Sequence, residues 1–316
     1  MEYKIKNFPI TMFAIVMGLS GLTIVLQKFA EHNWLPNWLY LSMLVTVSLI
    51  FIVIAAFYVL KLIMFREAVV ADFRHRIRIN FFSTISISFL LLSVAFHPVS
   101  NFVSEVLWWI GTILHAYLML HTIRFWIQHN FEIHTFSPAW FIPVVGNIVI
   151  PVMGVEFLPI SISFFFFSVG AFFWIVLFTI FLNRVVFHDQ MPQKFIPTLF
   201  ILLAPPAVGF IAYYKITMQW DLLGIFLLNI AYFFAFLLVF LWKSFRNIKF
   251  FISWWAFIFP LDALTIASVL AYSISGQIAY LYASWVGIIV VVLFVSYVGY
   301  KTIEKLIVGE VCVEEE

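Results

Sequence analysis

Charged residues are scarce in this sequence of 316 residues. Asp, Glu, Lys and Arg together make up 10% of the chain, whereas a typical soluble domain contains about 25%. Hydrophobic residues make up 65% and the mean hydropathy is +1.09, which excludes a water-soluble fold. A net charge of +2 indicates no nucleic-acid partner. We therefore expect a single integral membrane domain over residues 1–316, with no soluble module.

Residues that support redox or metal chemistry are also few. The single cysteine, Cys312, excludes an intrachain disulfide. His115 and His121 lie six residues apart and do not share a helix face, and no His, Cys or Glu spacing matches a metal or haem site. Glycine-rich phosphate loops and nucleophile motifs are absent. We therefore expect no enzyme activity, no cofactor and no bound metal.

Apolar runs of membrane-spanning length fill most of the chain. About 20 residues of helix cross a bilayer core, and the runs are continuous rather than alternating, which favours helices over barrel strands. The sequence predicts an all-α polytopic membrane protein, and its ten spans lie near 8–30, 37–64, 78–97, 104–128, 138–155, 158–187, 193–215, 221–245, 252–273 and 277–303. An acidic, solvated tail is expected from about 306 to 316.

Proline is absent from the interior of every even-numbered run. Seven of the twelve prolines lie inside odd-numbered runs: Pro9, Pro143, Pro151, Pro197, Pro205, Pro206 and Pro260. Proline removes a backbone hydrogen bond and bends a helix, and in lipid such breaks belong where protein or a water-filled cavity satisfies the backbone. The odd-numbered spans are therefore predicted to form an inner set that lines a pore, with the even-numbered spans facing lipid.

The distribution of basic residues predicts the orientation. With ten spans, fifteen of the seventeen Lys and Arg residues fall on the side of the two termini, and only Lys28 and Lys215 fall opposite. Because basic residues are enriched on the cytoplasmic side, both termini are predicted to be cytoplasmic, in a cell membrane.

The ninth run contains the strongest candidates for function. Pro260 cannot donate to the Ala256 carbonyl, so the helix should kink in mid-membrane. Phe259 beside this kink would block water and ions if its ring faced a lumen; alternatively, it is one more packed phenylalanine among forty. Asp262, one turn further on, shares roughly the face of Phe259.

A carboxyl near the bilayer midplane costs on the order of 3 kcal/mol and usually faces a bundle interior or cavity. Asp262 could couple transport to protons or form a polar element of the path. It could equally be a protonated, hydrogen-bonded group that ties the kinked helix to serines of the third span. An ionised carboxylate would repel anions, which favours a neutral or off-axis Asp262. Gly18 and Gly21 of the first span would allow close helix approach.

Several motifs resemble those of the tellurite-resistance/dicarboxylate transporter family, which includes TehA-like bacterial proteins and plant slow anion channels. They are Asn7-Phe-Pro9 with Gly18-Leu-Ser-Gly21, Glu105-Val-Leu-Trp-Trp-Ile-Gly111, Trp140-Phe-Ile-Pro143, and Trp254-Trp-Ala-Phe-Ile-Phe-Pro260. The resemblance spans all ten runs. It implies five helical hairpins in a quasi-five-fold arrangement around a central pore in each subunit of a homotrimer. It also implies a mid-pore phenylalanine gate, which by motif position is Phe259.

Asp262 and the short termini depart from plant-type members of this family. The expected function is an anion-selective channel or channel-like permease for small anions such as nitrate or chloride. The proposed pore and kink residues are Pro9, Gly18, Pro143, Pro197, Pro205 and Pro260, with Phe259 as the gate. The alternatives are a proton-coupled transporter of C4-dicarboxylate, sulfite or tellurite, which Asp262 motivates, and a membrane redox enzyme that uses the histidines.

Overall fold

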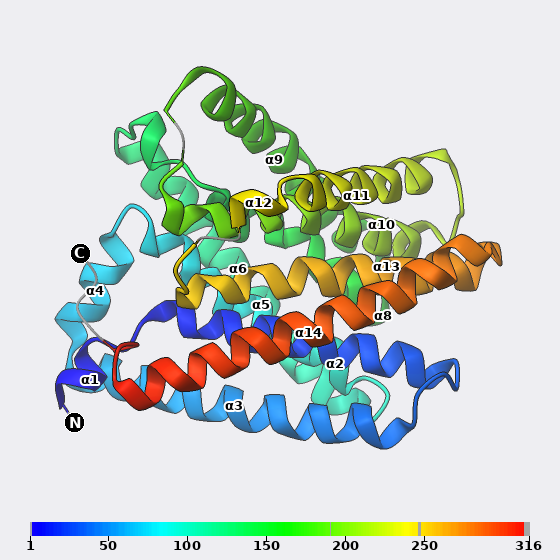
Figure 1. Cartoon of the computed structure of the whole chain (residues 1–316), viewed down its shortest axis with the longest axis horizontal. Helices are drawn as coiled ribbons and strands as arrows, with labels where there is room; N and C mark the ends of the chain where they lie inside the picture. Colours follow the sequence, from blue (N-terminus) through cyan, green and yellow to red (C-terminus); the bar gives the residue numbers. More distant parts are fainter. Residues whose placement is uncertain (1, 190, 246–247, 313–316) are drawn as a thin grey trace.

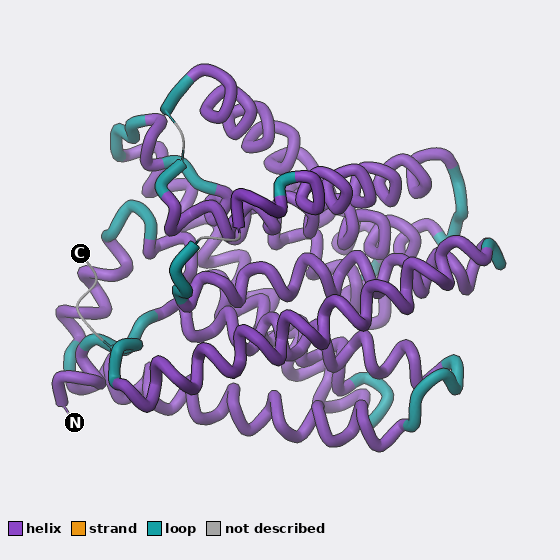
Figure 2. The backbone as a smooth tube through the Cα atoms, viewed as in Figure 1, coloured by secondary structure: helices purple, strands orange, loops and turns teal. Residues whose placement is uncertain are grey.

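The computed structural model describes residues 2–189, 191–245 and 248–312, with the backbone alone at 193–195. Within these residues the protein consists of helices and connecting loops, and contains no strand (Figure 2). Ten helical segments are long and apolar enough to cross a membrane. The fold class predicted from the sequence is therefore confirmed.

The five odd-numbered spans are each assembled from short pieces. Their bounds are Ile10–Glu31 (η1 Ile10–Met12, α2 Phe13–Glu31), Arg78–Phe96 (η2 Arg78–Phe82, α5 Ser83–Phe96), Pro138–Phe157 (η4 Pro138–Trp140, α7 Phe141–Val145, η5 Gly146–Val149, α8 Ile150–Phe157), Ile196–Thr217 (the end of η6 Gln193–Leu203, α10 Ala204–Thr217) and Ile252–Ser275 (η7 Ile252–Phe257, α13 Ile258–Ser275). In every case a 3₁₀ segment precedes or interrupts the α-helix.

The five even-numbered spans are long, uninterrupted α-helices. They are α3 Asn37–Met64, α6 Asn101–Gln128, α9 Ile160–Phe187, α11 Leu222–Phe240 and α14 Ile278–Val308. Short helices occupy the loops: α1 Glu2–Lys6, α4 Arg66–Arg74, η3 Ile133–Thr135 and α12 Trp242–Phe245. The predicted span 221–245 is thus an α-helix that ends at Phe240, followed by a separate short turn.

Burial separates the two sets of spans as the proline pattern predicts. Within an 18-residue apolar window of each span, 61–89% of the residues are buried in the odd-numbered spans, against 17–39% in the even-numbered ones. The exposed surface of the even-numbered helices is rich in large apolar side chains, as lipid contact requires. The inner and outer sets are therefore real features of the fold.

The inner spans contact one another in a closed cycle. α2 packs against α5, α5 against η5 and α8, these against α10, α10 against α13, and α13 back against α2. Each outer helix contacts its inner neighbour along the chain, as α3 contacts α2 and α6 contacts α5. The spans run roughly side by side across Figure 1, with the two chain ends at the same side of the molecule. The quasi-five-fold symmetry of this cycle stays a prediction.

Proline accounts for most of the breaks in the inner spans. Pro260 lies in the first turn of α13, directly after the 3₁₀ segment η7. Pro205 occupies the first turn of α10 after η6 in the same way. Pro143 lies within the five-residue α7, between two 3₁₀ segments. Proline is tolerated at a helix start because its missing N–H would be unpaired there, so each proline marks the junction at which an α-helix restarts.

The third span is broken without a proline. Its first turn, η2, is a 3₁₀ helix in which the Asn80 side chain donates to the carbonyls of Ile77 at 3.2 Å and Arg76 at 3.4 Å. An asparagine that bonds to local carbonyls competes with regular helix hydrogen bonding. The hydrogen bonds of the Asn80 side chain therefore start the third span with a 3₁₀ turn, as proline does in the other inner spans.

A buried ion network holds the end of the bundle that carries the termini. Lys61 Nζ lies 2.6 Å from Asp72 Oδ2 and donates to the Phe8 carbonyl at 2.9 Å, and Arg78 Nη1 donates to Asp72 Oδ1 at 2.8 Å. Because Phe8 precedes Pro9 at the start of the first inner span, Lys61 satisfies a backbone carbonyl at the proline break. The network joins α3, α4 and the entries of two inner spans.

The C-terminal segment folds back onto this same end. α14 continues to Val308, beyond the predicted end at 303, and Gly309 (φ +82°) turns the chain in the left-handed conformation. Val311 is buried, and a Cβ on Gly309 would lie 3.4 Å from Lys4 Nζ. Within the described part of the expected acidic tail, Val311 is buried and Glu310 is exposed, and residues 313–316 lie outside the described chain.

Candidate functional site

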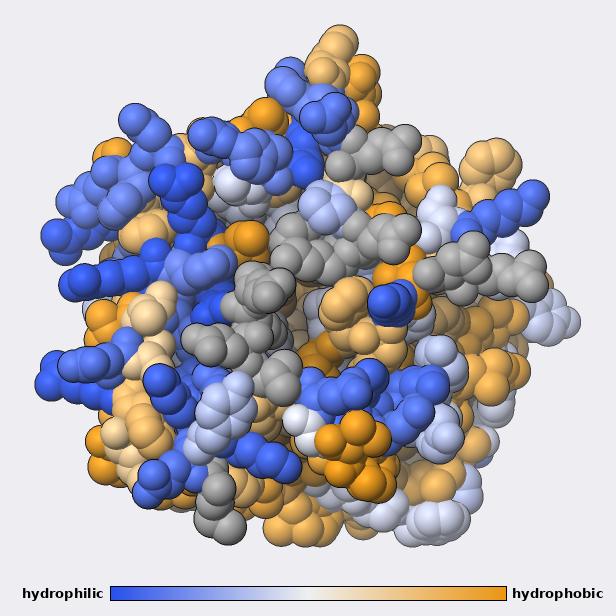
Figure 3. Space-filling view, turned by 60° about the vertical axis from the view of Figure 1, so that its left-hand side comes forward, coloured by the Kyte–Doolittle hydropathy of each residue, from blue (hydrophilic) through white to orange (hydrophobic). Residues whose placement is uncertain are grey.

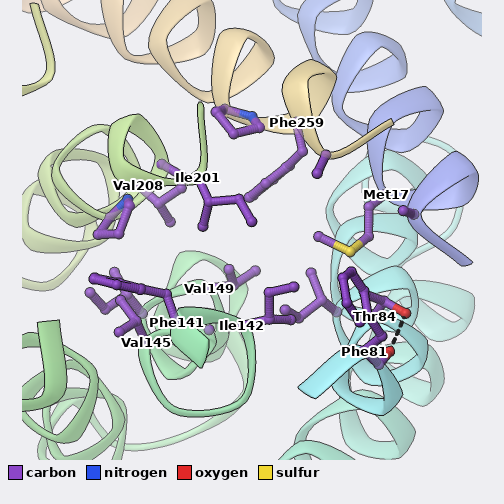
Figure 4. A pocket seen from close by; sticks show the side chains of 18 of the residues that line it. Met17, Phe81, Thr84, Phe141, Ile142, Val145, Val149, Ile201, Val208 and Phe259 are labelled. Carbon is purple, nitrogen blue, oxygen red and sulfur yellow. Dashed lines mark hydrogen bonds between the residues drawn. The ribbon is translucent and has the colours of Figure 1, made fainter. Parts of the chain in front are cut away.

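A narrow cavity lies where the five inner spans meet. Its volume is about 60 Å³, and each inner span contributes side chains to it (Figure 4). The lining includes one residue from each span in turn: Met17, Thr84, Ile142, Ile201 and Phe259. At about 10–15 Å³ per water, this space admits only a few water molecules. We call it the neck.

The walls of the neck offer almost no polar group. Of its lining side chains, only Thr84 and Trp255 carry a polar atom. The Thr84 hydroxyl donates to the Phe81 carbonyl at 2.6 Å, and the Trp255 ring N–H donates to Thr302 at 2.9 Å. Both groups are engaged within the protein, so an ion in the neck would meet an apolar surface, which is the property of a hydrophobic constriction.

Phe259 extends into the neck from the start of α13. In Figure 4 its ring points from α13 toward Ile201, across the space from Ile142. The side chain is half-buried, in contrast to the fully buried Phe257 two residues earlier. Phe259 thus lines the neck and also packs against the hydrophobic core, and its role as a gate stays a prediction.

The predicted pore and kink prolines occupy three kinds of position. Pro205 and Pro260 line the neck beside Phe259. Pro143 and Pro197 are buried in the inner spans and are not among the lining residues. Pro9 lies at the entry of the first span, where η1 begins.

Gly18 serves packing rather than the lumen. A Cβ at this position would lie 3.0 Å from Ile258 Cβ and 3.3 Å from the Trp255 ring. The absence of a side chain lets α2 approach α13 closely, just where α13 begins. Gly18 therefore supports the segment that carries Phe259.

Asp262 does not face the neck. Its side chain lies against α2, where a Cβ on Gly21 would stand 2.8 Å from the Asp262 Cβ. The carboxyl is fully buried, and neither oxygen has a hydrogen-bond partner among the described residues. The alternative in which Asp262 is hydrogen-bonded to serines of the third span finds no such bond among the described residues. The off-axis position agrees with the expectation for an anion path.

A much wider cavity opens on the terminal end of the bundle. Its volume is about 820 Å³, and Phe81 lines both this cavity and the neck, so the two adjoin. We call it the vestibule. Figure 3 shows hydrophilic residues gathered on the face that carries this end of the molecule. The chain therefore has a wide cavity with charged residues in its lining beside a narrow apolar neck.

Basic side chains outnumber acidic ones in the vestibule. Arg78, Lys249, Lys301 and Lys305 line it, together with Glu304 and Glu310. Lys301 pairs with Glu304 at 2.7 Å, and Lys305 pairs with Glu310. Arg78 pairs with Asp72 outside the lining at 2.8 Å, so Lys249 is the lining cation with no ion pair in the described chain, and a cleft with an excess of one charge raises the local concentration of opposite ions.

Sequence reasoning missed the vestibule as a site. The sequence assigned these basic residues to one side of the membrane. It did not show that they share a cavity, because they come from loops and spans far apart in the chain: residue 78, residue 249 and the end of α14. The spacing of Lys301 and Lys305, one helical turn apart, was a weak signal of a basic face.

No group of three His, Cys, Asp or Glu side chains is close enough to hold a metal ion within residues 2–189, 191–245 and 248–312. His115 is fully buried against Ser86, and His121 stacks on the Phe73 ring with centroids 4.4 Å apart.

The fold and these two adjoining cavities define a polytopic membrane protein of the channel or transporter class. The chain belongs to the SLAC1 family, described as voltage-dependent anion channels, whose model matches residues 7–303. Members of this family are anion channels and transporters rather than enzymes.

Similar proteins come from plants, archaea and bacteria. S-type anion channel SLAH2 of Arabidopsis thaliana is 30% identical over 280 residues, which cover 83% of this chain and 52% of the relative. An uncharacterized transporter, MJ0762 of Methanocaldococcus jannaschii, is 26% identical over 87% of this chain and 88% of its own length. The tellurite resistance protein TehA homolog of Haemophilus influenzae is 28% identical over 67% and 65%. The chain spans about half the length of the plant channels it matches.

Proposed function

We propose that this protein is an anion channel or channel-like permease for small monovalent anions such as nitrate and chloride. One observation carries the proposal: an apolar neck built from all five inner spans adjoins a vestibule with an excess of basic side chains. The vestibule concentrates anions, and the neck passes those that lose water most readily, because its walls replace few hydration contacts. Weakly hydrated monovalent anions meet this condition best.

Phe259 is the proposed gate of this path. Its ring enters the neck from a helix start held by Pro260 and packed through Gly18. Phe259 lies at the start of α13, just after the 3₁₀ segment η7. A small change in that segment can therefore move its ring, whereas a ring in the middle of a regular helix is held by the turns on both sides. Rotation of the ring toward Ile201 or away from it would narrow or widen the neck.

Reversal potentials test the proposed function. Purified protein in a planar bilayer is placed between unequal concentrations of nitrate, chloride or malate with a common cation. A channel selective for anions gives a Nernstian shift of the reversal potential for nitrate and chloride and little current for malate. A reversal potential that follows the cation gradient, from protein whose assembly is intact, would refute the proposal.

We further propose that the protein is a homotrimer in the cell membrane, with one path in each subunit and both termini in the cytoplasm. The lipid-facing surfaces of the outer helices leave room for subunit contacts, and the basic residues gather at the terminal end. Native mass spectrometry in detergent measures the number of subunits. Reporter fusions at each terminus measure orientation: a fluorescent protein should be active and alkaline phosphatase inactive at both.

A proton-coupled carrier for C4-dicarboxylate, sulfite or tellurite is the second candidate, and Asp262 favours it. A buried carboxyl without a partner in the described chain is a group that could take up and release a proton during transport. Asp262→Asn keeps the shape and removes the titration. If the carrier hypothesis holds, this variant loses pH-driven uptake into vesicles; unchanged uptake would exclude Asp262 from coupling.

A further inference from the structure

The C-terminal turn brings an acidic side chain into the lining of the vestibule. Gly309, in the left-handed conformation, ends α14, and the N–H groups of Gly309 and Glu310 both donate to the Lys305 carbonyl at 3.0 Å. Glycine in this conformation is a common end of an α-helix, because it reverses the chain without strain. The reversal places Glu310 and Val311 beside the last turns of α14, and both residues line the vestibule.

The Glu310 carboxylate occupies the ammonium group of Lys305. Lys305 Nζ donates to Glu310 Oε2 across the turn. Lys301, one turn earlier in α14, pairs in the same way with Glu304 at 2.7 Å. Lys249 lines the same cavity and has no ion pair in the described chain. At Lys305, a carboxylate of the chain itself therefore stands where an anion from solution would bind.

Both members of the Lys305–Glu310 pair are open to water. The exposed fractions of the two side chains are 38% and 53%, against 4% and 8% for the buried pair of Lys61 and Asp72. An exposed ion pair contributes little to stability, because water solvates either partner alone. A buried pair cannot separate without leaving a charge unsolvated. An anion in the vestibule can therefore replace Glu310 at Lys305, whereas the buried network cannot exchange its carboxylate in this way.

Burial of Val311 keeps Glu310 beside Lys305. Val311 is 8% exposed and belongs to the hydrophobic core, whereas Glu310 before it is exposed. Glu304 differs, because it projects from within α14, three residues from its partner. Helix ends open more readily than helix interiors. Loss of the Val311 contact would therefore let the turn that carries Glu310 move away from Lys305 without unfolding the span.

We propose that Lys305 is an anion-binding site of the vestibule and that Glu310 is its built-in competitor. This inference rests on the proposed anion-channel function and adds a site where anions collect before they enter the neck. The ligand class is a small monovalent anion in exchange with solution. When Glu310 leaves, Lys305 joins Lys249 as an unpaired cation of the lining, and the local anion concentration rises. The rate at which anions enter the neck rises in proportion, so the competitor lowers the current.

The test uses the full chain in planar bilayers at about 10 mM and about 1 M chloride, because the Debye length falls from about 30 Å to about 3 Å between these concentrations. Glu310→Gln removes the competing charge and keeps the side-chain size. Lys305→Gln removes the site, and Val311→Ser weakens the hold on the turn without changing any charge. Glu67→Gln is the matched control: Glu67 lies on α4 at the end that carries the termini (Figure 1) and does not line the vestibule.

At about 10 mM chloride, Glu310→Gln should raise the current of anions that enter from the vestibule side by about two- to fivefold. Val311→Ser should shift it in the same direction, Lys305→Gln should lower it, and Glu67→Gln should match wild type. At about 1 M chloride these differences should disappear, because salt screens the site.

The failure of this inference is distinct from the failure of the proposed function. If wild type carries no anion current at either concentration, the proposed function itself fails. If wild type conducts and Glu310→Gln matches it at low salt, the site at Lys305 is overturned. An equal rise in Glu67→Gln would overturn it as well, because the charge of the whole surface would then explain the effect. Should Val311→Ser not assemble, Glu310→Gln decides by the same measurement.

Discussion

Removal of the Phe259 ring gives the most direct test of how the neck limits conduction. The neck, of about 60 Å³, has room for few waters, so an anion inside it has lost most of its hydration. Phe259→Ala replaces the ring with a methyl group and readmits water beside the ion. One hydrogen bond from water to a charged species contributes about 1.5–3 kcal/mol, which lowers the barrier enough to raise the current by about 10- to 150-fold.

The assay compares currents of wild type and variant in planar bilayers at equal protein density. Truncation of a fully buried phenylalanine costs about 3–5 kcal/mol, but Phe259 is only half-buried and faces a cavity, so the variant should assemble. Phe226→Ala is the matched control, because Phe226 lies on an outer helix with 54% of its surface exposed. Variant protein that assembles normally and conducts like wild type would remove Phe259 from the gate. An equal rise in the control would show that the effect is not specific to the neck.

Three further changes probe the frame around the path. Lys61→Met removes one partner from the buried Asp72 carboxylate and from the Phe8 carbonyl at the first proline break. In thermal unfolding this variant should be less stable than wild type by about 3 kcal/mol. Full stability would show that the network is dispensable. Gly21→Ala forces a Cβ against Asp262 and should lower the stability of the protein by about 1–3 kcal/mol. Gly299→Ala is the control, because open space surrounds Gly299, and it should be tolerated. Equal losses of stability in the two variants would contradict the close contact at Gly21. Burial raises the pKa of the Cys312 thiol, with nearby lysines opposing the shift, so less thiolate forms at a given pH and alkylation, followed by mass spectrometry, should begin at higher pH than for a free cysteine. A pH profile equal to that of a free thiol would mean that the C-terminal turn is not packed.

The proline pattern predicted which helices are inner because a broken helix must be shielded from lipid. The five spans that carry prolines or the Asn80 break are the five with high burial, and the ten spans lie close to their predicted positions. Span ends were less accurate: α14 extends to Val308, because residues after 303 continue the helical hydrogen bonds before Gly309 ends them. In the sequence, only Gly309 marks this end of the helix, and the prediction did not use it as a stop signal.

Side-chain direction was the part of the site that periodicity could not supply. Asp262 follows Phe259 by three residues, and a regular helix would place both on one face. Here Phe259 lines the neck at the start of α13, whereas Asp262 packs against Gly21 of α2 and is not among the lining residues. His115 is fully buried, and nothing in its sequence neighbourhood indicates that its ring would lie against Gly146, thirty-one residues later.

Composition and the order of breaks along the chain determined the membrane class, the number of spans and their inner and outer roles, because each depends on the free energy of exposing polar backbone or apolar surface to lipid. The tertiary structure alone decided which side chains share a cavity. The vestibule and the neck are assembled from segments more than two hundred residues apart, and their dimensions depend on helix positions that only the packing of the whole bundle fixes.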